Sequence, residues 1–469
     1  MQSSYIPPIS DPGSATPSPS LGMVETSRLY ACAIFLLFLS VQADGFGHAD
    51  SLNLVLMRSA LALFLLGCVA MLFPHHHPFR FKKSSTPGEN AWRVLFALAS
   101  LSQLASLALF YKSAQHYHFV GYRFYPHTTP YLFLLAALVP LFVLLQPDQP
   151  STRKLLIAAL LPVTIVGLLT VFSDPLDPRR SDMQPLIAAA DTSLLHRVAP
   201  YHLYRLLSGP VLLTYLPVTW LLYLPFNAAH LDPRLLNLLS VLLLGSFLVL
   251  ATKPRFRVYS AGMVALLACS PYLQYRHDIY TPPHWLCLIA ALLLTARRRW
   301  AAAAILLGVS AAMSQFSWIL APFWLLYLFE EEGAPQALVH GAIAAITAAL
   351  CILPFWVWDK KALLYGILGH WNGGGVNARP ASLSSLAAVF AGASHLQHVQ
   401  AIVLLLLLVW CWRTRRSRSL ASIFATMTVA LLLFVFFNVL VWGYFFLLIG
   451  WMAILCVLTS NDWLKREQA

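Results

Sequence analysis

The sequence predicts an all-α, polytopic membrane helix bundle of about 14 transmembrane helices, with interfacial helices in its external loops. Composition is the first observation behind this prediction: 59% of the 469 residues are hydrophobic and only 10% are charged. A soluble protein of this size needs a charged, wettable exterior that such a composition does not supply. The second observation is that continuous apolar runs, rich in Leu and Ala, recur along the chain, instead of the short alternating strands of a membrane barrel. The runs cover residues 28–42, 53–73, 93–111, 131–146, 155–172, 210–226, 235–252, 259–275, 284–296, 301–329, 337–357, 398–412, 420–437 and 439–458.

Basic residues gather in short clusters between these runs, which is typical of cytoplasmic loops that contact anionic lipid. The clusters lie at 80–83, 152–154, 253–257, 297–299 and 413–418. The net charge of +13 therefore indicates membrane lipids as partners. No aromatic-interleaved basic domain is present, so we expect no nucleic-acid partner.

The orientation of the spans follows from the same clusters, except in the middle of the chain. A Pro/Ser-rich tail at 1–25 is predicted to be disordered and inside, and the segment 358–397 is predicted to be outside. Strict alternation after residue 172 places the clusters 253–257 and 297–299 outside, against the positive-inside rule. Two short spans within 301–329 would return 297–299 to the inside but require one more crossing upstream. The sequence leaves this alternative open.

Two polar segments are predicted on the external face. The first, 173–209, begins with acids and arginines and continues with spaced apolar residues that favour helices lying in the membrane interface. The second, 358–397, contains a glycine triplet, Trp371 and the cation Arg379. An acid at the mouth of a membrane bundle can act as a general base, hold a divalent cation or pair with an arginine that orders a loop.

An ordered series of motifs in residues 153–460 resembles a known family. The motifs are SDMQPLIAAADTSLLHRVAPYHLY (181–204), TYLPVTWLLYLPF (214–226), SPYLQYRHD (270–278) and NVLVWGYFFLLIGWM (438–452). Together they resemble the fold-C class of membrane glycosyltransferases, and most nearly the polyprenol-phosphomannose-dependent mannosyltransferases. The resemblance implies transfer of mannose or another hexose from a polyprenyl-phosphate donor to a hydroxyl of a lipid or glycan acceptor, at the external or luminal face.

The resemblance also assigns roles to individual residues. It implies that Asp182 is the catalytic base. Some relatives carry an Asp-x-Asp pair here, but this chain has Arg180 at the first position, so a second carboxylate would come from Asp177 or Asp174. No cofactor is implied with certainty, and the metal, a divalent cation such as Mg or Mn, stays open. The residues expected to bind substrate are Arg180, Tyr201, Arg276, His370 and Arg379.

Four parts follow from this reading: the tail at 1–25, a four-helix accessory bundle at 26–150, the catalytic module at 151–460 and a cytoplasmic tail at 461–469. The bacterial inner membrane is the expected location, with the endoplasmic reticulum as the alternative. A multi-span transporter or lipid flippase without transferase chemistry is the alternative function, and a non-catalytic membrane scaffold is a third. The near absence of charge in the spans disfavours ion-coupled transport.

Overall fold

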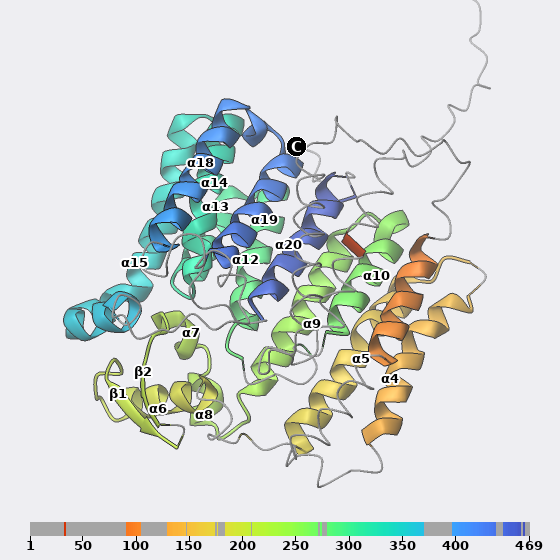
Figure 1. Cartoon of the computed structure of the whole chain (residues 1–469), viewed down its shortest axis with the longest axis horizontal. Helices are drawn as coiled ribbons and strands as arrows, with labels where there is room; N and C mark the ends of the chain where they lie inside the picture. The colour runs from red at the N-terminus through yellow and green to blue at the C-terminus, as the bar shows by residue number, and fades with distance from the viewer. Residues whose placement is uncertain are drawn as a thin grey trace, which may run out of the picture.

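The structure is a computed structural model of the whole chain, and the segments that it describes are mostly helical (Figure 1). The predicted all-α class is confirmed at this level, with one small β-hairpin as the exception. The described residues are 32–33, 91–104, 129–146, 148–173, 176, 183–207, 209–270, 273, 279–369, 396–437, 444–460 and 463–464.

The helices follow the order of the apolar runs. The longer ones are α4 (Thr129–Leu144), α5 (Thr152–Ser173), α9 (Arg234–Ala251), α10 (Arg257–Ala268), α12 (Pro282–Ala296), α13 (Trp300–Ala311), α14 (Gln315–Glu332), α15 (Ala334–Leu364), α18 (Leu396–Arg413), α19 (Leu420–Phe436) and α20 (Phe445–Ser460). Smaller elements are α6 (Met183–Leu195), β1 (Leu203–Leu206), β2 (Gly209–Leu212), α7 (Pro217–Leu221), α8 (Leu224–Ala228) and the π-helical turn η3 (Tyr365–Gly369).

Among the described residues, three helices are long and apolar enough to cross a bilayer: Thr152–Phe172, Arg234–Ala251 and Ala334–Leu368. Large apolar side chains remain exposed on their outer faces, including Phe172 at 79% and Leu350 at 63% of the full accessible surface. Such surfaces are stable against lipid and unfavourable in water. These helices indicate a membrane protein.

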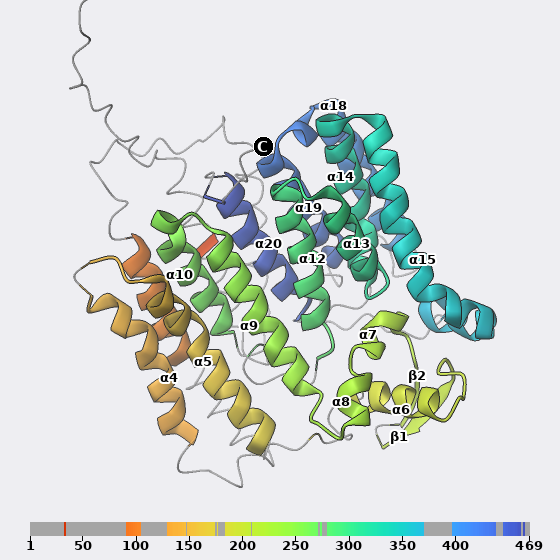
Figure 2. The same cartoon turned by 180° about the vertical axis from the view of Figure 1, so that it is seen from behind.

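One hydrophobic core runs through the bundle, and it includes both early and late segments of the chain. Helices α4, α5, α9 and α10 pack together on one side, and α12 to α15 with α18 to α20 form the other (Figures 1 and 2). Contacts of α12 with α9 and of α10 with α20 join the two sides. A glycine permits the closest packing, because a Cβ on Gly308 of α13 would collide with the carbonyl of Ala344 on α15.

The predicted span at 210–226 is wrong. This stretch forms β2, α7 and α8 instead of one helix, and Pro217 and Pro225 each lie at the start of a short helix. Proline is favoured in the first turn of a helix and disfavoured after it, because it lacks an N–H and its ring clashes with the previous turn. Residues 203–206 and 209, expected as interfacial helix, belong to the strands of the hairpin, whereas Met183–Leu195 is helical as expected.

The single run at 301–329 is two helices, which was the alternative left open by the sequence. Helix α13 ends at Ala311 and α14 begins at Gln315. Ser314 ends the turn between them, and its hydroxyl accepts a hydrogen bond from the Phe316 N–H at 3.4 Å. A serine N-cap of this kind favours the start of a new helix over continuation of the old one.

The basic clusters 253–257, 297–299 and 413–418 form polar contacts at one end of the bundle. Arg257, at the start of α10, donates to Thr152 at the start of α5 (2.7 Å), and the Lys253 N–H donates to the carbonyl of Trp463 (2.7 Å). On the other side, Arg298 pairs with Glu331, and Arg418 pairs with Glu330 at 2.8 Å. The clusters 253–257, 297–299 and 413–418 therefore share one end of the molecule with the chain's last described residues.

Candidate functional site

Residues 183–228 form a separate unit, which we call the cap, at the opposite end of the bundle (Figure 1). The cap comprises α6, the β1–β2 hairpin, α7 and α8, and it has its own hydrophobic core. Two contacts join it to the turn between α13 and α14: the Val218 N–H donates to Ala312 (3.2 Å), and the Thr219 hydroxyl donates to Met313. The core consists of Leu186, Ile187, Ala190, Tyr201, Tyr204, Leu213, Leu216, Trp220, Tyr223 and, from the end of α15 and η3, Phe355, Leu363 and Ile367.

Tyr201, one of the predicted substrate-binding residues, lies in this core. Its hydroxyl donates to the carbonyl of Tyr215 at 2.8 Å and accepts from the indole N–H of Trp220 at 3.3 Å. Its ring packs edge-on against Phe355, with ring centroids 6.2 Å apart. The side chain is only 5% exposed, and burial raises the pKa of its phenol. In this structure Tyr201 therefore joins the hairpin region to α7 and α15.

The other predicted site residues, Asp182, Arg180, Arg276, His370, Arg379, Asp177 and Asp174, lie outside the described residues. Described residues close in sequence to Asp182 and Arg276 contact each other at the backbone carbonyl of Ile279. Gln184, two residues after Asp182, donates to the Ile279 carbonyl at 3.5 Å, and Ile279 lies three residues after Arg276. Asn237 of α9 donates to the same carbonyl at 2.6 Å, and the Tyr223 hydroxyl donates to Asn237.

The chain before His370 also reaches the cap. Gly366, in η3, lies so close to the hairpin that a Cβ there would come within 2.5 Å of the Leu213 carbonyl and 3.2 Å of the Tyr201 ring. Only glycine fits this approach without a shift of the backbone. The described parts of the cap thus contact segments adjacent to Arg276 and His370, and the cap itself begins one residue after Asp182.

Asp191 is a buried acid that the sequence analysis did not select. Its side chain is fully buried on α6, and one carboxylate oxygen, Oδ2, accepts a hydrogen bond from the Asn227 amide of α8. The other oxygen, Oδ1, has no hydrogen-bond partner among the described residues. Burial raises the pKa of this carboxyl to about 7, although the Asn227 hydrogen bond acts in the opposite direction. Asp191 therefore changes protonation near neutral pH.

The signal for Asp191 was present in the sequence. Gln184 and Asp191 are seven residues apart, which places them on the same face of α6, and Ile187 lies between them on that face. Two polar residues on an otherwise apolar helix face indicate a polar contact inside the protein. The partner, Asn227, lies 36 residues further along the chain, and no local pattern connects the two.

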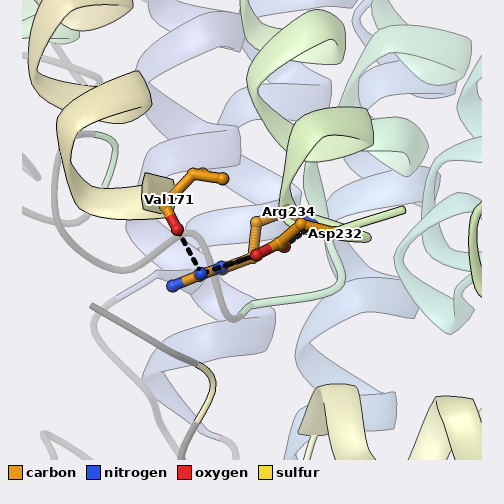
Figure 3. Close-up of polar contacts among 3 residues, drawn as sticks. All are labelled: Val171, Asp232 and Arg234. Carbon is orange, nitrogen blue, oxygen red and sulfur yellow. Dashed lines mark hydrogen bonds and ion pairs between the residues drawn. The ribbon is translucent and has the colours of Figure 1, made fainter. Parts of the chain in front are cut away.

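Arg234 is the other fully buried charge among the described Asp, Glu, Lys and Arg residues. Figure 3 shows its guanidinium between Asp232 and the end of α5. It pairs with the Asp232 carboxylate at 2.6 Å, and one of its terminal nitrogens donates to the carbonyl of Val171 at 2.8 Å. Arg234 therefore connects the last turn of α5, which precedes the cap in the sequence, to the first turn of α9, which follows it.

Within the described part of the chain, no group of three or more His, Cys, Asp or Glu side chains could hold a metal ion. The predicted carboxylates Asp174, Asp177 and Asp182 lie outside that part. The Mg or Mn alternative therefore stays a prediction.

Comparison with known proteins found no matching family model, no matching curated protein and no matching solved structure.

The raised pKa of Asp191 predicts a pH-dependent stability. An unfolded aspartate releases its proton near pH 4, whereas folded Asp191 retains its proton up to about pH 7. Between these values the folded state binds more protons, so the free energy of unfolding falls as the pH rises from about 4 to about 7. Asp191→Asn should remove this fall, measured as the difference in Tm of the detergent-solubilised protein between pH 5 and pH 8.

The matched control for this measurement is Asp148→Asn, because Asp148 is an exposed acid outside the cap. It should keep the pH dependence of the parent protein. An Asp191→Asn variant whose Tm changes with pH as much as that of the parent would rule out Asp191 as the titrating group.

A second prediction concerns Arg234. Arg234→Gln should lower the free energy of unfolding by about 3 kcal/mol, because it leaves a partly buried carboxylate and the Val171 carbonyl without their cation. Arg205→Gln, at an exposed position in the hairpin, should change it by less than about 0.5 kcal/mol. Thermal or denaturant unfolding of the solubilised variants measures both, and equal effects would contradict the structural role assigned to Arg234.

Proposed function

We propose that the chain is a fold-C membrane glycosyltransferase that moves mannose or another hexose from a polyprenyl-phosphate donor to a hydroxyl acceptor. The cap carries this proposal: a unit with its own hydrophobic core, which begins one residue after Asp182 and lies opposite the basic clusters. Both buried charges of the described residues, Asp191 and Arg234, lie at this end. A site here would meet a lipid-linked donor at the membrane surface.

We propose a topology with about 14 crossings, formed by the five apolar runs before residue 173 and the nine longer helices from α9 onward. The cap would stay outside without crossing, and α13 and α14 would cross separately. The clusters 253–257, 297–299 and 413–418 then all lie inside, in agreement with the positive-inside rule. Polar contacts support this arrangement: Arg298 and Arg418 both pair with acids at the end of α14, and Arg257 donates to Thr152 at the start of α5. The bacterial inner membrane is the proposed location.

In the proposed reaction Asp182 accepts the proton of the acceptor hydroxyl while that oxygen attacks C1 of the sugar. A new C1–O bond forms as the bond from C1 to the lipid phosphate oxygen breaks, and the phosphate leaves with the electron pair. The leaving phosphate needs a positive charge beside it. Arg180, Arg276, Arg379 and His370 are the candidate groups for this role, and a divalent cation is the alternative.

The described charges disfavour the transporter alternative. Transporters place ionisable residues near the middle of the membrane to couple ion movement. The buried Asp and Arg found in the described segments both lie at the cap end, Asp191 within α6 and Arg234 at the start of α9. This distribution supports chemistry at a membrane surface more than transport through the bundle.

Asp182→Asn tests the proposal. The purified protein is reconstituted with a panel of polyprenyl-phosphate hexoses, and sugar transfer to a hydroxyl acceptor is measured. Loss of a general base should reduce transfer by about 100-fold or more, while Asp148→Asn retains activity. Full transfer by Asp182→Asn would contradict the assigned role, and lipid flux without sugar transfer by the parent protein would favour the flippase.

A further inference from the structure

Helix α15 changes direction near its end. Asp359 has non-helical dihedral angles (φ −153°, ψ 88°) inside the helix. Its carboxylate accepts a hydrogen bond from the Ala362 N–H at 3.0 Å, which caps the segment that follows. Figures 1 and 2 show this terminal segment turned away from the bundle axis, next to the hairpin of the cap. We call residues 356–368 the elbow.

One side of the elbow belongs to the core of the cap. Leu363 and Ile367 are buried there with Tyr201, and Gly366 lies against the Leu213 carbonyl. The elbow is thus held to the cap by a buried face.

The other side combines exposed aromatic and apolar groups with two cations. Lys360 and Lys361 are exposed, and neither forms an ion pair with a described residue. The carboxylate of Asp359, the residue before these lysines, accepts the hydrogen bond from the Ala362 N–H. The exposed fractions are 42% for Trp356, 76% for Val357, 44% for Trp358, 39% for Leu364, 61% for Tyr365 and 47% for Leu368.

We propose that the elbow docks in the membrane interface next to the cap and binds anionic phospholipid headgroups. Trp and Tyr concentrate at headgroup depth because their rings are amphipathic. Leu364 and Leu368 extend the same surface toward the acyl chains, as in an interfacial helix. The two lysines supply the charge that favours an anionic headgroup over a zwitterionic one. The proposal needs the membrane setting of the proposed function but not sugar transfer, so the two can fail separately.

Docking would allow the lipid composition of the leaflet to affect the conformation of the cap. The elbow contacts the cap core through Leu363, Gly366 and Ile367. A change in the position of the elbow would therefore reach Tyr201 and the hairpin directly, without passing through the rest of the bundle.

Tryptophan quenching by brominated lipids tests the proposal. The full chain is placed in nanodiscs that contain increasing mole fractions of brominated phosphatidylglycerol or brominated phosphatidylcholine. The difference in fluorescence between the parent and Trp356→Phe/Trp358→Phe isolates the signal of the elbow. Phosphatidylglycerol should reach half-maximal quenching of this signal at a mole fraction roughly 5-fold lower than phosphatidylcholine.

Lys360→Gln/Lys361→Gln should abolish the preference, and Lys360→Arg/Lys361→Arg should retain it. Arg153→Gln/Lys154→Gln removes the same charge from exposed positions at the basic end and should leave the elbow signal unchanged. Equal quenching by the two lipids, or an unchanged preference in the double Gln variant, would overturn the proposal. Absence of quenching by either lipid would also overturn it, and would direct attention to a second copy of the chain on this surface.

Discussion

The arrangement of the site depends on the backbone carbonyl of Ile279, which accepts hydrogen bonds from both Gln184 and Asn237. This carbonyl joins α6 of the cap, α9 of the bundle and the residues before α12. Buried polar groups must find partners, because an unpaired one costs about 1–3 kcal/mol. The buried guanidinium of Arg234 also has a partner, because it donates to the Val171 carbonyl at the end of α5. The cap is therefore fixed to the bundle by polar contacts at its edge and by an apolar core at its centre.

The buried carboxyl of Asp191 gives the cap a titratable group in its interior. A network whose members are all satisfied mainly orders a structure, whereas Asp191 has one oxygen without a partner among the described residues. Its pKa of about 7 makes the α6–α8 contact sensitive to pH near neutrality. In the proposed enzyme this contact would lie on α6, the helix that follows the base in the sequence.

The helical bundle could be predicted from the sequence, because apolar runs of spanning length have few other solutions. The cap could not, since residues 210–226 are as apolar as a span, and only Pro217 and Pro225 indicate the interruption. The same holds for 301–329, where the break depends on one serine cap. Of the predicted site residues only Tyr201 falls among the described residues, and its buried hydroxyl contacts depend on Trp220 and Tyr215, which no local pattern pairs with it.

We propose that the cap and the basic clusters lie on opposite sides of the membrane, and cysteine labelling in sealed vesicles measures this topology. Single cysteines replace Arg205 in the cap and Lys154 at the basic end, in a chain whose seven native cysteines are removed. A membrane-impermeant maleimide added outside right-side-out vesicles should label position 205 at once and position 154 only after the membrane is permeabilised. Labelling of both positions from the same side of intact vesicles would contradict the claim.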